Sequence, residues 1–206
     1  MISSQFYELR LYQVERGRMN DMIARRKDAL QTLFQRHGIA PLGNWYTSMG
    51  RNSPLFVYLM RWPDWETRQK AWAGFYSDPE WWAARESTNA GSELVERYEL
   101  NFLKEIHPWV AHPDVSRLTL ELHITKIDIG RSAAAEALVK NDLNARLATH
   151  GGQVLGAFEY LTGDDLPRAA LFVGWDNATQ AEAMQHLLEA APLNRSDRYR
   201  LTHIPL

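Results

Sequence analysis

The sequence contains no cysteine among its 206 residues. This absence excludes disulfide bonds, thiolate zinc sites, iron–sulfur clusters and cysteine nucleophiles, so the fold must be stable through packing alone. No apolar run approaches the roughly 18 residues of a membrane helix, and no charged leader precedes an apolar stretch near the N-terminus. We therefore expect a cytoplasmic protein that does not bind membranes.

An excess of charge is also absent. The chain has 23 Lys and Arg residues, 25 Asp and Glu residues and a formal net charge of -2. Because this balance leaves no broad basic surface, we do not expect nucleic acid as a partner. Glycine-rich phosphate loops, nucleophile elbows and metalloprotease motifs are missing as well. The sequence therefore argues against nucleotide-dependent chemistry, and we expect no metal and no cofactor.

An internal repeat is the main feature that the sequence does contain. Shifting the chain by 113 residues aligns the two copies without a gap. Aligned pairs include Glu8 with Glu121, Gly17 with Gly130, His37-Gly38 with His150-Gly151, Pro54 with Pro167, and Trp62 with Trp175. Two His-Pro pairs fall between the copies, which favours a linker over residues 105–114. The predicted domains are therefore residues 1–104 and 115–206.

Each copy is predicted to contain a strand, a helix, a hairpin of two strands, a helix and a final strand. In the first copy these elements are residues 5–14, 18–36, 41–62, 64–90 and 94–103. In the second copy they are residues 117–127, 131–149, 153–175, 177–190 and 198–204. Within 64–90, Asp78 and Pro79 predict a break and a new helix start. The order of elements is that of a ferredoxin-like α+β unit.

The first strand of each copy alternates between two kinds of side chain. In the first copy, one face carries Tyr7, Leu9 and Leu11, and the other carries Glu8, Arg10 and Tyr12. We expect the apolar face to pack beneath the helices and the charged face to remain open. The open faces of the two copies would then cover each other and form an intramolecular α/β barrel, a pseudo-dimer within one chain. Glu121 and His123 would line its interior with Glu8 and Arg10.

Several motifs resemble those of the NIPSNAP family, a branch of the dimeric α/β-barrel superfamily. They are "YELRLY" at residues 7–12, the tryptophan at Trp62 and "SDPEWW" at residues 77–82. The first copy matches from about residue 5 to residue 103, whereas the second copy has diverged. The resemblance implies ferredoxin-like units paired in a barrel and a poorly defined function. Related barrel families include cofactor-free monooxygenases, isomerases and haem-degrading enzymes, so a small ligand in the barrel is the analogy that follows.

Three ionisable residues are the candidates for catalysis: Glu8, Glu121 and His123. Either glutamate in a partly apolar cleft would have a raised pKa suited to proton transfer. The alternative is an ion pair with an arginine such as Arg61 or Arg97. His123 is a candidate general base or haem ligand, and the alternative for it is a hydrogen-bonded interior histidine.

A small organic ligand is the expected partner, bound by side chains of the first copy. The candidate ligand-binding residues are Arg10, Tyr12, Trp45, Tyr58 and Arg61. Three functions remain open: a small-molecule enzyme or binding protein, a haem or metal binder through His123, and a structural protein with a filled barrel. The chain is expected to be a monomer with a pseudo-dimeric barrel or a homodimer.

Overall fold

The computed structural model describes residues 5–110, 117–183, 185–188 and 191–205. The chain divides into two compact units. The N-terminal unit comprises Met1–Ser48, Asn52–Leu100 and Ile204–Leu206, and the C-terminal unit comprises Met49–Arg51 and Asn101–His203. Each unit therefore contains most of one sequence copy. Met49–Arg51 of the first copy is assigned to the C-terminal unit, and Ile204–Leu206 of the second copy is assigned to the N-terminal unit.

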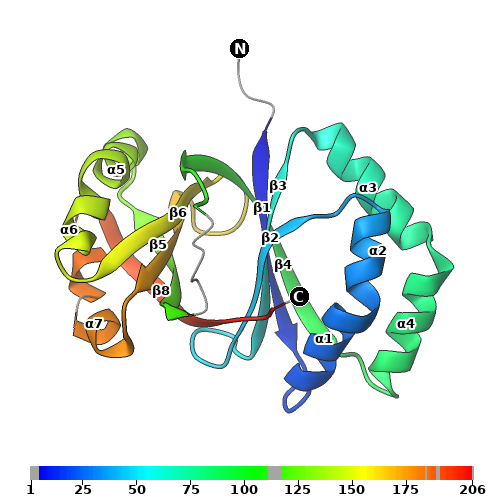
Figure 1. Ribbon diagram of the computed structural model, residues 1–206. Coiled ribbons are helices and arrows are strands. Elements are labelled where there is room, and N and C mark those ends of the chain that lie inside the picture. The colour runs from blue at the N-terminus through cyan, green and yellow to red at the C-terminus, as the bar shows by residue number, and fades with distance from the viewer. Residues whose placement is uncertain (1–4, 111–116, 184, 189–190, 206) are drawn as a thin grey trace. The chain divides into compact units, whose positions relative to one another are not determined.

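The N-terminal unit has the predicted order of elements (Figure 1). Its elements are β1 (Phe6–Val14), α1 (Met19–Arg25), a π-helical turn (Arg26–Leu30), α2 (Gln31–Arg36), β2 (Pro41–Thr47), β3 (Leu55–Trp62), α3 (Trp65–Ser77), α4 (Pro79–Asn89) and the start of β4 (Val95–His107). The predicted helix break is confirmed, because Asp78 caps α4 and Pro79 is its first residue. The four helices lie on one side of β1, β2 and β3.

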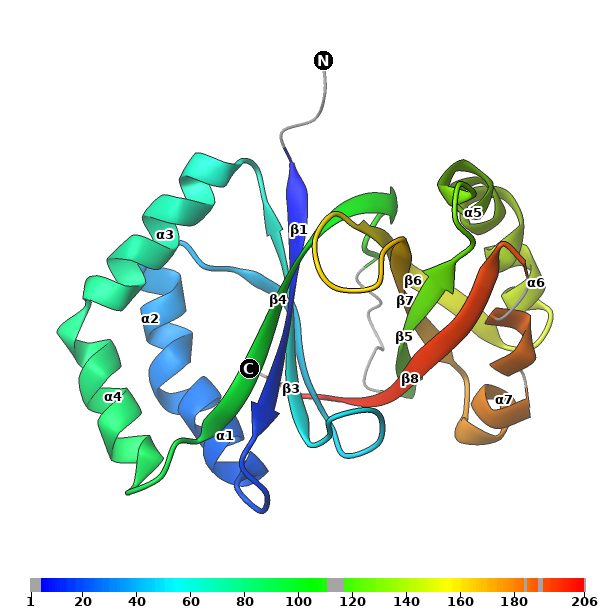
Figure 2. The same cartoon turned by 180° about the vertical axis from the view of Figure 1, so that it is seen from behind.

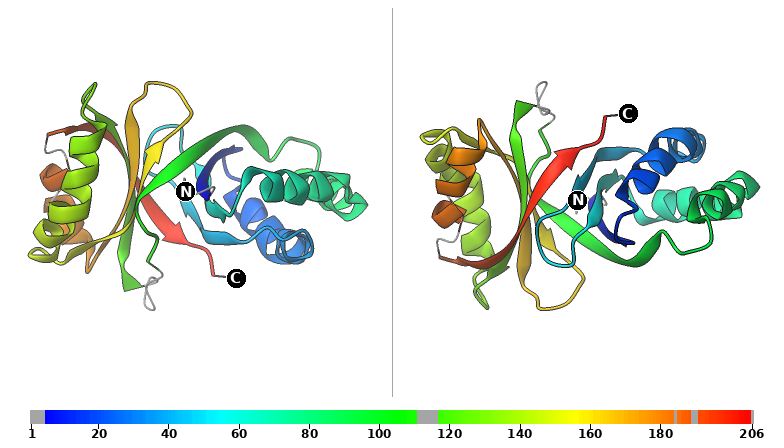
Figure 3. Two further views of the ribbon diagram at one scale, coloured as in Figure 1. Left: turned by 90° about the horizontal axis from the view of Figure 1, so that it is seen from above. Right: turned by 90° about the horizontal axis from the view of Figure 1, so that it is seen from below.

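The C-terminal unit repeats this order. Its elements are β5 (Thr119–Ile127), α5 (Ser132–Leu138), a π-helical turn (Val139–Leu143), α6 (Asn144–Ala148), β6 (Gly152–Tyr160), β7 (Arg168–Trp175), α7 (Ala178–Ala183), a 3₁₀ turn (Gln185–Leu188) and β8 (Leu193–His203). Residues 184, 189 and 190 of the predicted helix 177–190 lie outside the described residues. The final strand starts at Leu193, earlier than predicted. Helices α5, α6 and α7 lie on one face of the strands of this unit (Figure 3).

The strands form a closed barrel in the order β1-β3-β2-β8-β5-β7-β6-β4. Within this order, β4-β1-β3-β2 and β8-β5-β7-β6 each have the strand order of a ferredoxin-like sheet. Figure 2 shows β1, β3 and β4 of the N-terminal unit from behind. The fold is therefore α+β, with two tandem ferredoxin-like units that form an intramolecular barrel, as predicted.

The predicted linker at residues 105–114 is only partly a linker. Strand β4 continues to His107, and Leu103 and Glu105 pair with β6 opposite Tyr160 and Phe158. Residues 108–110 belong to no helix or strand, and residues 111–114 of the predicted linker lie outside the described residues. Backbone pairing with β6 therefore extends the strand past the end of its hydrophobic pattern.

The predicted assignment of the two faces of β1 is wrong. Glu8 receives hydrogen bonds from Arg68 of α3, and the guanidinium of Arg10 lies over the ring of Trp72 on the same helix. The charged face of β1 therefore lies beneath the helices. In the C-terminal unit, Glu121 likewise accepts a hydrogen bond from Trp175, whose ring belongs to the cluster formed with the helices.

The error has a simple physical cause, since both faces of β1 are buried. Tyr7, Leu9 and Leu11 are at most 4% exposed, and Glu8 and Arg10 are at most 2% exposed. Alternation identifies the core-facing side of a strand only when the other side meets water. Here the charged side is accommodated because the helices supply partners for its charges.

Candidate functional site

Glu8 is the centre of a buried hydrogen-bond cluster in the N-terminal unit. Its carboxylate accepts hydrogen bonds from Nε of Arg10 at 2.8 Å and from the indole N–H of Trp62 at 2.9 Å. Nε and Nη2 of Arg68 each donate to a different carboxylate oxygen at 2.9 Å. Because the Glu8 side chain is inaccessible to solvent, these donors replace the water that its charge would otherwise bind.

Arg10 extends this cluster to Tyr12. Its Nη1 donates to the hydroxyl oxygen of Tyr12 at 2.7 Å, and its guanidinium carbon lies 3.6 Å from the ring centroid of Trp72. A guanidinium over an indole face is a favourable cation–π arrangement. The stacking and the bond to Glu8 fix Arg10, so Arg10 in turn positions the Tyr12 hydroxyl.

The electrostatics of Glu8 do not match the predicted proton-transfer role. Burial raises the pKa of Glu8, but hydrogen bonds from Arg68 and the charge of Arg10 outweigh burial and bring the pKa below its usual value. The expectation of a raised pKa is therefore wrong, and Glu8 is a counter-ion for arginines. Its partners are Arg10 and Arg68 instead of Arg61 or Arg97.

Glu121 occupies the equivalent position in the C-terminal unit. One of its oxygens accepts hydrogen bonds from Nε of Arg198 at 2.9 Å and from Arg200 at 3.1 Å. The other oxygen lies 3.0 Å from Nε2 of His123 and accepts from Trp175 at 3.2 Å. Burial raises the pKa of Glu121, but hydrogen bonds from His123 and Arg198 lower it to about 2. Glu121 is therefore also a counter-ion and lacks the raised pKa that was expected.

His123 is completely buried and takes the place that Arg10 has in the other unit. Its Nε2 contacts Glu121, and its Nδ1 lies 3.5 Å from the hydroxyl oxygen of Ser196. Both ring nitrogens therefore already face polar side chains. Among the described residues, no group of three or more His, Asp and Glu side chains could hold a metal ion.

A cavity of about 340 Å³ lies in the N-terminal unit. Strands β1, β3 and β4 and helices α1 to α4 all contribute to its wall, so it lies between the sheet and the helices. Its lining is mainly aromatic and includes Tyr12, Tyr58, Trp72, Tyr76, Trp81 and Tyr98. Tyr58 is 1% exposed, whereas Trp82 and Tyr98 at the wall are 50% and 62% exposed. The cavity therefore runs from a buried phenol to solvent-exposed rings.

Three charged side chains also line the cavity: Arg25, Arg85 and Glu93. Arg85 forms an ion pair with Glu93, so these two charges compensate each other. Arg25 is 4% exposed and donates hydrogen bonds to the side chains of Thr88 and Asn89, both at 2.6 Å. Burial lowers the pKa of Arg25 to about 10. Arg25 is therefore a buried cation whose hydrogen-bond partners are neutral.

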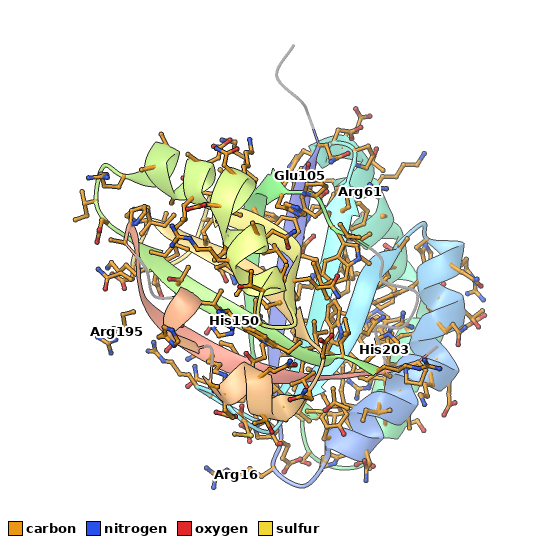
Figure 4. All side chains as sticks on the ribbon, turned by 60° about the vertical axis from the view of Figure 1, so that its left-hand side comes forward. Arg16, Arg61, Glu105, His150, Arg195 and His203 are labelled. Atoms are coloured by element: carbon orange, nitrogen blue, oxygen red, sulfur yellow. The ribbon has the colours of Figure 1, made fainter. Side chains whose placement is uncertain are left out.

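The structure separates the predicted ligand-binding residues into two groups. Tyr12 and Tyr58 line the cavity, and Arg10 lies behind Tyr12. Trp45 pairs with Val57 and Arg61 pairs with Tyr7, positions that belong to the other face of the sheet. Arg61 is exposed near the end of β3 (Figure 4). These five side chains therefore cannot hold one small ligand together.

Sequence reasoning missed Arg25, Arg68 and Tyr76. A signal existed on α3, because Arg68, Trp72 and Tyr76 are spaced by four residues and so share one face of the helix. Arg25 lies three residues after Met22, on the apolar face of its helix. A cation inside an apolar helical stripe is a pattern that could have indicated a buried charge.

A comparison with known protein families matches the part of the chain that contains the Glu8 cluster and the cavity. The sequence model of the NIPSNAP family matches residues 7–107. The N-terminal half of the chain belongs to the NIPSNAP family. This NIPSNAP domain contains the Glu8 cluster and the whole cavity lining. No curated protein matches the chain significantly.

Solved structures with TM-scores above 0.5 show the same fold at low sequence identity. A proposed monooxygenase from Lactobacillus acidophilus NCFM is 9% identical with a TM-score of 0.61, covering 98% of this chain and 95% of its own. An anthrone oxidase-like protein is 12% identical with a TM-score of 0.56, covering 98% and 93%. An uncharacterised NIPSNAP-like domain protein from Burkholderia xenovorans is 18% identical with a TM-score of 0.46, covering 54% and 98%. Within the described residues, none of the helices combines the length and apolarity needed to cross a membrane.

Proposed function

We propose that the NIPSNAP domain binds a small, planar organic molecule in the cavity between its sheet and its helices. The observation that carries this proposal is the aromatic lining of a cavity of about 340 Å³. Pockets for small molecules have volumes of about 300–1,000 Å³ and combine apolar walls with a few polar groups. A bicyclic or tricyclic ring system is the size of ligand that this volume favours.

The orientation of the lining rings supports a flat ligand. Trp72 and Tyr76 stack with their planes 27° apart and their centroids at 5.7 Å. Tyr12 meets Tyr58 edge to face at 5.5 Å. Aromatic ligands gain most when they can adopt such offset-stacked and edge-to-face contacts. This arrangement supports a ligand site on the helical side of the sheet, and we propose that site in place of the barrel interior that the sequence suggested.

The other two candidate functions have less support. A haem or metal ion bound through His123 would have to displace either Glu121 or Ser196 from an imidazole nitrogen. A purely structural role does not require a cavity, because packed interiors leave few voids larger than a water molecule. Solved structures of the same fold have names that include oxidases and monooxygenases, but identities of 9% and 12% indicate the fold alone.

Filling the cavity tests the proposal. Val95 lines the cavity from β4, and Val95→Phe adds a ring at that wall. We expect the parent protein to bind naphthalene derivatives with a change in tryptophan fluorescence, and Val95→Phe to lose this binding. Isothermal titration calorimetry with 2-naphthoate and 2-naphthamide would measure the affinity of the parent and of Val95→Phe. Binding of both compounds to Val95→Phe as tightly as to the parent would contradict the proposal, and so would a parent protein that binds neither.

A matched control variant is available in the C-terminal unit. Val110→Phe makes the same substitution at a residue that is 45% exposed and does not line the cavity. It should bind both compounds like the parent. Thermal unfolding of both variants would show that loss of binding in Val95→Phe does not result from loss of the fold.

A further inference from the structure

Buried positive charge exceeds buried negative charge on the helical side of the N-terminal sheet. Arg10, Arg25 and Arg26 are at most 4% exposed. Glu8 compensates Arg10, but Glu8 also binds Arg68. No described carboxylate lies within 4.0 Å of Arg25 or Arg26. The region therefore contains more cationic charge than its own carboxylates balance.

The uncompensated charges are accompanied by free donor groups. Nη1 of Arg25 makes no hydrogen bond with a described residue, while its Nε and Nη2 bind Thr88 and Asn89. Nη1 of Arg26 is buried and has no hydrogen-bond partner among the described residues. Burial lowers the pKa of both arginines. A buried charge without a counter-ion is unfavourable, and Arg25 is the one of these two arginines that lines the cavity, so an anion in the cavity next to Arg25 would be stabilised.

Two phenol groups in the cavity wall add donors of the same kind. The Tyr12 hydroxyl accepts a hydrogen bond from Arg10, so its own proton must point elsewhere, and none of the described residues accepts it. The Tyr58 hydroxyl belongs to a side chain that is 1% exposed, and it has no hydrogen-bond partner in the described part of the chain. The pKa of both phenols is raised, chiefly by burial, so both keep their protons.

We propose that the ligand of this cavity is a planar aromatic molecule with an anionic oxygen, such as a carboxylate, held by Arg25 and by the hydroxyls of Tyr12 and Tyr58. This inference rests on the proposed function and adds the charge of the ligand to it. The aromatic rings bind the planar part of the molecule. The guanidinium and the phenols supply charge-assisted hydrogen bonds to its oxygens.

The test compares three compounds of nearly equal shape: 2-naphthoate, which is anionic, 2-naphthamide, which is neutral, and 2-(aminomethyl)naphthalene, which is cationic at neutral pH. We expect the parent to bind the carboxylate about tenfold or more tightly than the amide, and the amine most weakly. Raising the salt concentration should weaken only carboxylate binding. If the amide binds as tightly as the carboxylate, the inference is wrong while the proposed function stands. If no compound binds, both are wrong.

Variants assign the preference to particular side chains. Arg25→Met should remove the difference between carboxylate and amide, and Arg25→Lys, which keeps the charge, should retain part of it. Tyr58→Phe should weaken carboxylate binding about tenfold, because it deletes only a hydroxyl. Controls are Arg16→Met, at an exposed arginine (Figure 4), and Tyr46→Phe, at a tyrosine on β2 that does not line the cavity. An unchanged carboxylate preference in Arg25→Met together with an unchanged carboxylate affinity in Tyr58→Phe, both with native circular dichroism, would overturn the assignment.

Discussion

Glu121 keeps its charge in a fully buried position because its neighbours are all donors. Arg198 and Arg200 donate from β8, and Trp175 donates from the end of β7. On the exposed side, Glu182 of α7 binds the same two arginines at 2.9 and 2.8 Å. Removal of the Glu121 charge would leave the inner ends of both arginines without a counter-ion, which is the costly way to break a buried ion pair.

This cluster predicts how stability depends on pH. The pKa of Glu121 falls from 4.5 to about 2 in the folded protein, so its charge stabilises the fold above pH 4.5. That contribution, about 3 kcal/mol, is lost as the pH falls from 4.5 towards 2. We expect Glu121→Gln to be less stable than the parent at pH 7 and the difference to shrink across this window. Urea unfolding at pH 7, 4.5, 3.5 and 2.5 would measure it, and a constant difference at all four values would disprove the assignment.

At the scale of elements, Asp78 joins two helices of the N-terminal unit. One carboxylate oxygen caps α4 by accepting from the N–H of Glu80 at 2.9 Å. The other accepts from Arg36 and contacts Nε2 of His37, both at 2.8 Å, at the end of α2. Hydrogen bonding by His37 is the main reason that the pKa of Asp78 is lowered to about 2. Asp64, by contrast, only caps α3 by accepting from the N–H of Thr67.

These two caps make a matched pair for mutation. Asp78→Ala should lower the melting temperature about twice as much as Asp64→Ala, because it removes a helix cap and the contacts to α2 together. Asp78→Asn keeps the capping oxygen and should fall between the parent and Asp78→Ala. Thermal unfolding followed by circular dichroism would measure all three variants. Equal shifts for Asp64→Ala and Asp78→Ala would show that the contacts to α2 contribute nothing.

The helices and strands themselves were predictable from the sequence. Which face of β1 and β5 packs against the helices was not. Asp78-Pro79 marks a helix start by local chemistry, and the offset of 113 residues relates Phe6–Val14 to Thr119–Ile127. Local signals of this kind do not depend on the rest of the fold. The face that carries Glu8 depends instead on Arg68, sixty positions along the chain. A strand buried on both sides gives no local sign of which face the helices cover.

At the scale of the whole molecule, the offset of 113 residues relates local structural features of the two units as well as their sequences. The π-helical turns at Arg26–Leu30 and Val139–Leu143 differ by this number, and so do Trp62 and Trp175, which both donate to a buried glutamate. The clusters around Glu8 and Glu121 are therefore a structural feature of the repeated unit. A feature present in both units cannot by itself explain the proposed ligand site, which uses residues of the N-terminal unit alone.

The residues that make the cavity differ between the copies. At the offset of 113, Thr125 corresponds to Tyr12, Leu171 to Tyr58, and Leu138 to Arg25. The Thr125 hydroxyl donates to the backbone oxygen of Asn194 at 2.7 Å, so it has no free proton to offer a ligand. The C-terminal unit therefore lacks the equivalent cation and both phenols.

The asymmetry predicts one ligand per chain. Calorimetric titration of the parent with 2-naphthoate should give a stoichiometry of about one, because the charged and phenolic donors lie in the N-terminal unit only. Tyr12→Phe should weaken binding about tenfold by removing one donor, while Thr125→Val, the corresponding change in the other unit, should leave affinity and stoichiometry unchanged. Two equivalent sites per chain, or equal losses in the two variants, would contradict the prediction. Binding should also raise the melting temperature with ligand concentration in the parent and in Thr125→Val alike, since a ligand that binds only the folded state stabilises it.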